Sequence, residues 1–137
     1  MFIEDYILRQ IAQLVAVLTK IAGLKKAGKY QEAYKTIDQT VEEMFGLDAN
    51  IVKQLDDNIL FGLLTTENGI DLAKIYALAD LLKAEGDVLA AQRRKKESRQ
   101  SYQRALDLFL ELSARSTVEL EAEVLPKINE LQKRLAT

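Results

Sequence analysis

The spacing of apolar and small side chains in this chain occurs twice, at an offset of 65 residues. Steps of three and four residues separate the matched positions, so each set lies on one face of a helix. A pattern repeated at this range predicts two helical hairpins that pack alike. The matched positions are Val17, Leu24, Ala33, Ile37, Thr40, Val41, Met44 and Leu47 against Leu82, Leu89, Ser98, Tyr102, Ala105, Leu106, Phe109 and Leu112.

The composition favours long helices over a sheet. Six glycines and one proline in 137 residues leave few breaks in the chain, and 48% hydrophobic with 29% charged residues is typical of a globular protein. We predict a single all-α domain whose antiparallel hairpins form a short stacked array or an irregular helical bundle. We expect hairpins at about residues 3–47 and 71–113, an insertion at 48–70 and a C-terminal helix at 116–135.

Glycines mark the expected helix ends of the first hairpin. A helix over about residues 3–27 is expected to stop at Gly28, and a second over about 31–45 at Gly46. The insertion is aliphatic enough for one or two short helices that pack onto the body, with a linker between domains as the alternative. Its clearest turn begins at Thr65, in the run Thr-Thr-Glu-Asn-Gly.

The second hairpin is expected to begin at Asp71, which can cap a helix. Gly86 lies inside that helix, where glycine costs ~1 kcal/mol relative to alanine and marks a close approach of two helices. Pro126 predicts a kink or a break in the last helix, which is expected to start at 116–117.

The polar segment 92–100 separates the two helices of the second hairpin. We expect a turn near residues 93–97, although the absence of glycine and proline leaves one continuous helix as the alternative. We interpret its charges as a solvated turn, and contact with an anion or a nucleic acid is the competing hypothesis. The densest group of positive charges in the chain lies here: Arg93, Arg94, Lys95 and Lys96.

The second hairpin resembles a tetratricopeptide repeat, a helix–turn–helix unit. The residues at the matching intervals are Gly86, Ser98, Tyr102 and Ala105. The repeat packs the glycine of its first helix against a small residue of its second, so the resemblance implies that Gly86 packs near Ser98. Residues 28–33 are similar to the turn of the same repeat, but Ile21 stands where the repeat has glycine, and the insertion separates the two units. The resemblance covers residues 17–47 and 82–112 and implies stacked helical hairpins.

The whole chain also resembles a small bacterial all-helical family of unknown function. Phe-Ile-Glu-Asp-Tyr-Ile at 2–7 and Leu-Leu-Lys-Ala-Glu-Gly-Asp at 81–87 carry this resemblance, which supplies no active site. The acidic start of the chain lacks the basic region of a signal peptide, so we expect a cytoplasmic protein. The apolar stretch 11–24 contains Gln13 and Lys20 and is shorter than the ~20 residues that a membrane span requires.

The lack of histidine and cysteine excludes several kinds of site. There can be no Ser-His-Asp triad, no zinc site built from histidine or cysteine, and no disulfide. Catalysis would have to rest on carboxylates, lysine or tyrosine, and we assign no catalytic residue, cofactor or metal ligand. The net charge of −2 is too near neutral to favour nucleic acid or an anionic membrane as the partner. We expect no membrane partner, and nucleic acid only as the alternative.

Two further groups of residues are candidates for binding. Tyr30, Tyr34 and Tyr102 form a possible partner groove, although core packing explains them equally well. Apolar residues of the first helix and of the insertion exceed what one neighbouring hairpin needs, and internal packing of the insertion competes with a homodimer as the explanation. The residues proposed for self-association are Phe2, Leu8, Leu60 and Phe61.

The function predicted from these observations is that of a non-enzymatic protein–protein interaction or scaffold module. The partner is expected to be a protein or a peptide, because stacked hairpins create a groove. A nucleic-acid-associated regulator that uses Arg93–Lys96 is the alternative, and a carboxylate-only enzyme is the third hypothesis. Nothing in the sequence identifies the partner, the pathway or a ligand.

Overall fold

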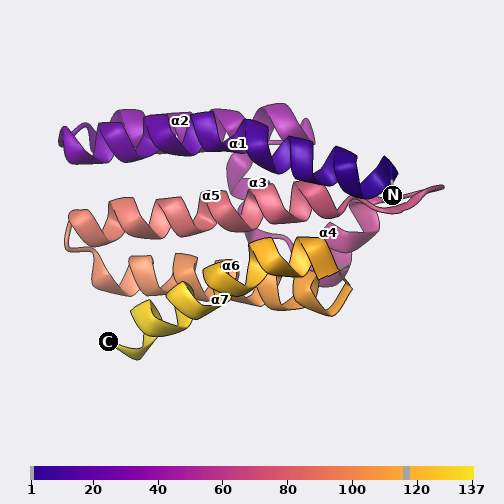
Figure 1. Ribbon diagram of the computed structural model, residues 1–137. Helices are drawn as coiled ribbons and strands as arrows, with labels where there is room; N and C mark the ends of the chain where they lie inside the picture. The colour runs from indigo at the N-terminus through magenta and orange to yellow at the C-terminus, as the bar shows by residue number, and fades with distance from the viewer. Residues whose placement is uncertain (1, 116–117) are drawn as a thin grey trace.

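The computed structural model describes residues 2–115 and 118–137, with side chains over 5–115 and 120–137. This part of the chain is helical apart from one short hairpin (Figure 1). The predicted all-α class is therefore confirmed. The elements are α1 (Phe2–Lys26), α2 (Tyr30–Phe45), α3 (Ala49–Gln54), α4 (Asp57–Leu63), β1 (Thr65–Thr66), β2 (Gly69–Ile70), α5 (Leu72–Ala91), α6 (Lys95–Arg115) and α7 (Val118–Ala136).

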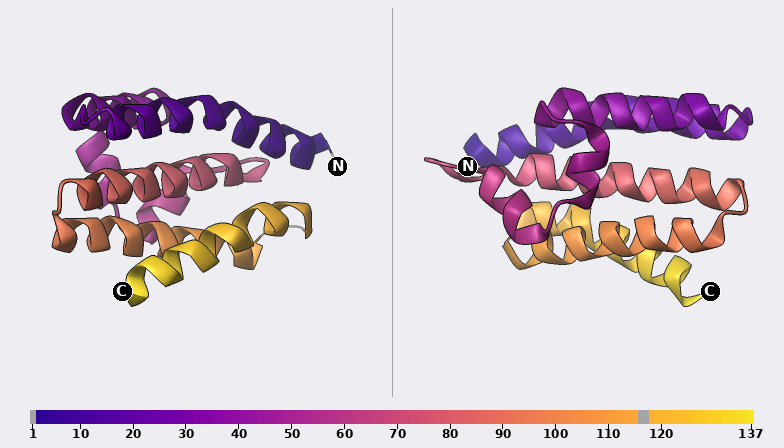
Figure 2. Two further views of the ribbon diagram at one scale, coloured as in Figure 1. Left: turned by 60° about the vertical axis from the view of Figure 1, so that its left-hand side comes forward. Right: turned by 180° about the vertical axis from the view of Figure 1, so that it is seen from behind.

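Helix α5 lies at the centre of the molecule. It packs against α1 and α2 on one side and against α6 on the other, and α7 packs along α6 (Figures 1 and 2). Every side chain from Ile75 to Leu82 is buried. A helix that is apolar on nearly all sides can be stable only inside a protein, so the sequence of α5 fixes its central place.

The first hairpin turns at Gly28, which has φ 74°. The Gly28 N–H donates to the Lys25 carbonyl over 3.0 Å, and the Lys29 N–H donates to the Leu24 carbonyl over 2.9 Å. These two bonds form a Schellman motif, which satisfies the last carbonyls of α1 and requires a left-handed residue at this position. Glycine adopts that conformation without steric cost.

The second hairpin has the same turn 65 residues later. The Arg93 N–H donates to the Ala90 carbonyl over 3.0 Å, and the Arg94 N–H donates to the Leu89 carbonyl over 2.9 Å. The left-handed position is Arg93, with φ 62°. The turn expected near residues 93–97 is therefore confirmed and one continuous helix over 92–100 is excluded, and α6 starts at Lys95.

Gly86 lets α5 approach α6 closely. The Ser98 hydroxyl donates to the Gly86 carbonyl over 2.7 Å, so the predicted contact between the two residues is confirmed. A Cβ atom on Gly86 would lie 2.5 Å from Cδ1 and Cε1 of the Tyr102 ring. No side chain, however small, fits there without displacing the ring.

The insertion packs on the body of the protein, and the alternative of an interdomain linker is wrong. The Lys53 ammonium of α3 bonds to Asp38 of α2 over 2.6 Å and to Glu85 of α5 over 2.5 Å. Arg104 of α6 donates to the Leu55 carbonyl over 2.5 Å, between α3 and α4. The expected turn after α4 is the tip of the antiparallel β1–β2 pair.

Pro126 does not end α7, which continues through it. The missing proline N–H would bond to the carbonyl of Ala122, and both residues are exposed, so water can satisfy the freed carbonyl. Of the predicted kink or break, the break is therefore wrong and the kink stays a prediction. The expected start at 116–117 lies outside the described residues.

Helix α1 is long and apolar enough over Asp5–Lys26 to cross a membrane, by length and composition alone. This finding corrects the expectation that the apolar segment is too short. The same helix carries core residues, since Ile7, Ile11, Leu14 and Ile21 are buried against the rest of the protein.

Candidate binding groove and charged surfaces

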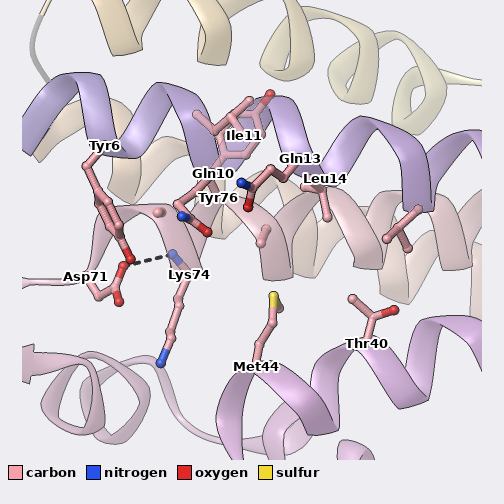
Figure 3. A pocket seen from close by; sticks show the side chains of 13 residues that line it. Tyr6, Gln10, Ile11, Gln13, Leu14, Thr40, Met44, Asp71, Lys74 and Tyr76 are labelled. Atoms are coloured by element: carbon pink, nitrogen blue, oxygen red, sulfur yellow. Dashed lines mark hydrogen bonds between the residues drawn. The ribbon is translucent and has the colours of Figure 1, made fainter.

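A groove lies between α1, α2 and the first turns of α5 (Figure 3). Its volume is about 210 Å³. Helix α1 contributes Tyr6, Gln10 and Gln13, whose side chains point into the groove. Helix α2 contributes Thr40 and Met44 from the opposite side, and α5 lies behind them. The floor is apolar and the rim is uncharged along most of its length, which is the composition of sites that bind amphipathic segments.

A second hollow of about 330 Å³ continues from one end of the groove. It lies beside the β1–β2 hairpin and shares Tyr6 and Asp71 with the groove. The Asp71 carboxylate accepts from the Lys74 N–H over 3.2 Å and so caps α5, as predicted. Tyr6 is 50% exposed at the junction. An aromatic side chain in this position offers a large apolar surface to a ligand.

The groove exists because the first hairpin carries smaller or more polar side chains than the second. Where the groove has Gln10, Gln13 and Met44, the positions 65 residues later hold Ile75, Leu78 and Phe109. All three of these later side chains are fully buried. The Phe109 ring packs edge-on against Tyr76 with 5.4 Å between the ring centroids. The second hairpin therefore fills the volume that the first leaves open.

A ladder of charged groups joins α7 to α5. Every pair has the same separation of 47 residues, so α5 and α7 run parallel, as Figure 1 shows. The pairs are Asp80 with Lys127 at 3.1 Å, Lys83 with Glu130 at 3.3 Å, and Asp87 with Arg134. Lys83 and Asp87 are mostly buried, so these pairs orient α7 more firmly than exposed ones would.

Burial and pairing set the ionisation of this ladder. Burial raises the pKa of Asp80, and the ammonium of Lys127 opposes that shift. Partial burial acts to raise the pKa of the Glu130 carboxyl. The positive charges of Arg134 and Lys83 outweigh this effect, so the pKa of Glu130 is lowered. Burial and the hydrogen bond to Asp87 raise the pKa of Tyr102 to about 12.

The three candidate tyrosines do not line one groove. Tyr30 lines a small hollow beside Gln92, and the Tyr34 hydroxyl donates to the Gln92 side chain over 2.5 Å. Tyr102 lies in another hollow, where its hydroxyl donates to Asp87 over 2.6 Å and accepts from Arg134 over 2.9 Å. Sequence spacing could not place them, since their separation depends on the packing of α2 and α6 around α5.

The basic turn is exposed, as the solvated interpretation requires. Arg94 pairs with Glu97, which raises the pKa of the guanidinium. Arg93 and Lys95 line a hollow of about 500 Å³ together with Arg99 and Arg134. Lys96 is not among the residues that line it.

The residues proposed for self-association are mostly internal. Leu60 and Phe61 are buried, and the Arg115 guanidinium lies over the Phe61 ring at 5.3 Å. Leu8 packs against the core, and the side chain of Phe2 lies outside the described residues. The insertion thus packs on the body through Leu60 and Phe61, but three of its other aliphatic side chains are more than half exposed and keep its part of the argument for a homodimer: Ile51, Ile59 and Leu63. The homodimer itself remains a prediction.

Among the described residues, no group of three or more acidic side chains is placed to hold a metal ion.

The site that the sequence analysis missed is the groove beside Tyr6. The repeat in the sequence contained a signal for this site. Residues 10 and 13 are glutamines, whereas the corresponding residues 65 positions later, 75 and 78, are apolar.

No family model matches the chain, and neither a curated protein nor a solved structure matches it.

Proposed function

We propose that this protein is an interaction module that binds an amphipathic helix of a partner protein in the groove between α1, α2 and α5. The observation that carries the proposal is the difference between the two hairpins. One equivalent volume is filled by Phe109, and the other is open and bordered by Met44. The stacked hairpins, similar to tetratricopeptide repeats, supply the rigid walls.

The shape of the groove favours a helix as its occupant. Between Tyr6 and Val17 the groove follows α1 for eleven residues, or about 17 Å at 1.5 Å per residue. A helix of about three turns covers that length and presents apolar residues at every third or fourth position. The neutral rim at Gln10, Gln13 and Thr40 suits polar flanks on such a helix, and Tyr6 extends the apolar contact.

The experiment is a selection of helical peptides from a random library on the immobilised protein, followed by calorimetry with the purified peptides. We expect the selected peptides to share apolar positions at helical spacing. Tyr6→Ala should weaken their binding about tenfold, because tyrosine is among the residues that contribute most to the energy of such contacts. Met44→Ala should weaken it as well.

Val15→Ala is the matched control. Val15 is 57% exposed on the same helix but does not line the groove. Its substitution should leave binding unchanged. Equal losses in the Tyr6 and Val15 variants, or a selection that yields no helical pattern, would contradict the proposal.

A further inference from the structure

The hollow at the turn between α5 and α6 is a second feature of the surface, which we call the basic hollow. It is lined by Arg93, Lys95, Arg99 and Arg134, together with Ala90, Ser98, Tyr102 and Thr137. Among the described residues, no acidic side chain lines it. Arg134 is held by Asp87 and Glu130, whereas neither Arg93 nor Lys95 pairs with a described carboxylate.

The equivalent turn of the first hairpin provides an internal comparison. Its hollow, of about 300 Å³, is lined by one basic and one acidic residue, Lys29 and Glu32. The left-handed position is Gly28 there and Arg93 in the basic hollow. The two hairpins therefore share one backbone turn, but its left-handed position holds glycine in the first hairpin and arginine, which disfavours that conformation, in the second.

Two local features of the basic hollow oppose folding. Arg93 occupies a backbone conformation that side chains disfavour. Lys95 is the first residue of α6, where the helix dipole favours negative charge. Unfavourable residues that persist in an otherwise consistent structure mark functional sites.

We infer that the basic hollow binds a compact phosphate-class anion with at least two negative charges. Such an anion neutralises the guanidinium of Arg93 and the ammonium of Lys95. The guanidinium of Arg99 is kept in place by donating to the Leu135 carbonyl over 2.8 Å. Charge-assisted hydrogen bonds to a dianion are the strongest contacts that these groups can form.

A small anion fits the observations better than a nucleic acid. Glu97 pairs with Arg94 beside the hollow, and the chain has a net charge of −2. A polynucleotide needs basic groups spread along several phosphates. The basic residues here line one concavity.

The test is calorimetry of the full chain with pyrophosphate at low and moderate salt. We expect saturable binding that weakens as salt is raised. The double variant Arg93→Gly/Lys95→Gln should weaken it about tenfold or more, since each lost charge-assisted bond is worth about that factor. Glycine suits the backbone at residue 93, so folding is preserved.

The control is Lys26→Gln/Lys29→Gln, which removes the same charge at the first turn and should change binding less than about twofold. No saturable binding by the parent protein, or equal weakening in the control, would overturn the proposal. So would tighter binding of an oligothymidylate of about a dozen nucleotides that depends on Arg93 and Lys95, because it would indicate a nucleic-acid interface.

Discussion

At the scale of single residues, the contact between Gly86 and Tyr102 sets how closely α5 and α6 pack. The ring faces the glycine, and its hydroxyl is held by Asp87 and Arg134. The ring is thus fixed at both ends and cannot turn away from a larger neighbour. Ser98 adds a hydrogen bond to the backbone at the same point.

Gly86→Ala should therefore destabilise the protein by ~1–3 kcal/mol through overpacking, measured by chemical denaturation. Gly23→Ala is the matched substitution, because Gly23 is also helical but a Cβ there meets nothing within 4 Å. It should stabilise the protein by roughly 0.5–1 kcal/mol. Similar effects of the two substitutions would show that the ring does not restrict residue 86.

Substitutions at the two left-handed turn positions, Gly28 and Arg93, should change the free energy of unfolding in opposite directions. Arg93→Gly should raise the free energy of unfolding by about 1 kcal/mol, because the backbone strain is removed. Gly28→Ala should lower it by a similar amount. A Cβ at residue 28 would meet no atom within 4 Å, so the cost comes from the backbone conformation, φ 74°, which alanine disfavours. Thermal melts of both variants against the parent would check the two signs, and a loss of stability in Arg93→Gly would refute the account of strain.

At the scale of elements, α7 depends on its charged ladder as well as on its apolar face. The apolar face buries Leu120, Val124 and Leu131, and the ladder fixes which way the helix runs along α5. The hydroxyl of Tyr102 joins this ladder through Arg134. Loss of the proton from the Tyr102 hydroxyl should therefore change how firmly α7 packs against α5 and α6.

Stability should fall as pH rises from about 10 to about 12. The pKa of Tyr102 is about 12 in the folded protein against 10.0 for an ordinary tyrosine, so over this interval the folded state keeps a proton that the unfolded state has lost. Thermal melts across this range should show a shallower decline for Tyr102→Phe than for the parent protein. Identical declines would mean that this phenol does not contribute.

At the scale of the whole molecule, the repeat in the sequence is sufficient to predict two hairpins, and the resemblance of the second hairpin to a tetratricopeptide repeat predicts the contact of Gly86 with Ser98. The tetratricopeptide likeness itself remains a proposal. The sequence was not sufficient to separate a turn from a continuous helix at 92–100, because the turn uses Arg93 where glycine is usual. It also misplaced Leu60 and Phe61, since the burial of short helices depends on partners distant in sequence.

The groove was missed for a related reason. Apolar periodicity locates the inner face of a helix, but it does not show whether facing side chains fill the space between two helices. Only the comparison of Met44 with its counterpart Phe109 in three dimensions shows that one hairpin is filled and the other is not.

The most direct test of the account is to fill the groove with the residues that the second hairpin uses. The variant Gln13→Leu/Met44→Phe should be at least as stable as the parent protein, because buried apolar area increases. Calorimetry with a selected helical peptide should then show binding lost, while light scattering confirms that the mass of the protein is unchanged. Undiminished peptide binding by the filled variant would contradict the claim that the open groove of the first hairpin is the binding site.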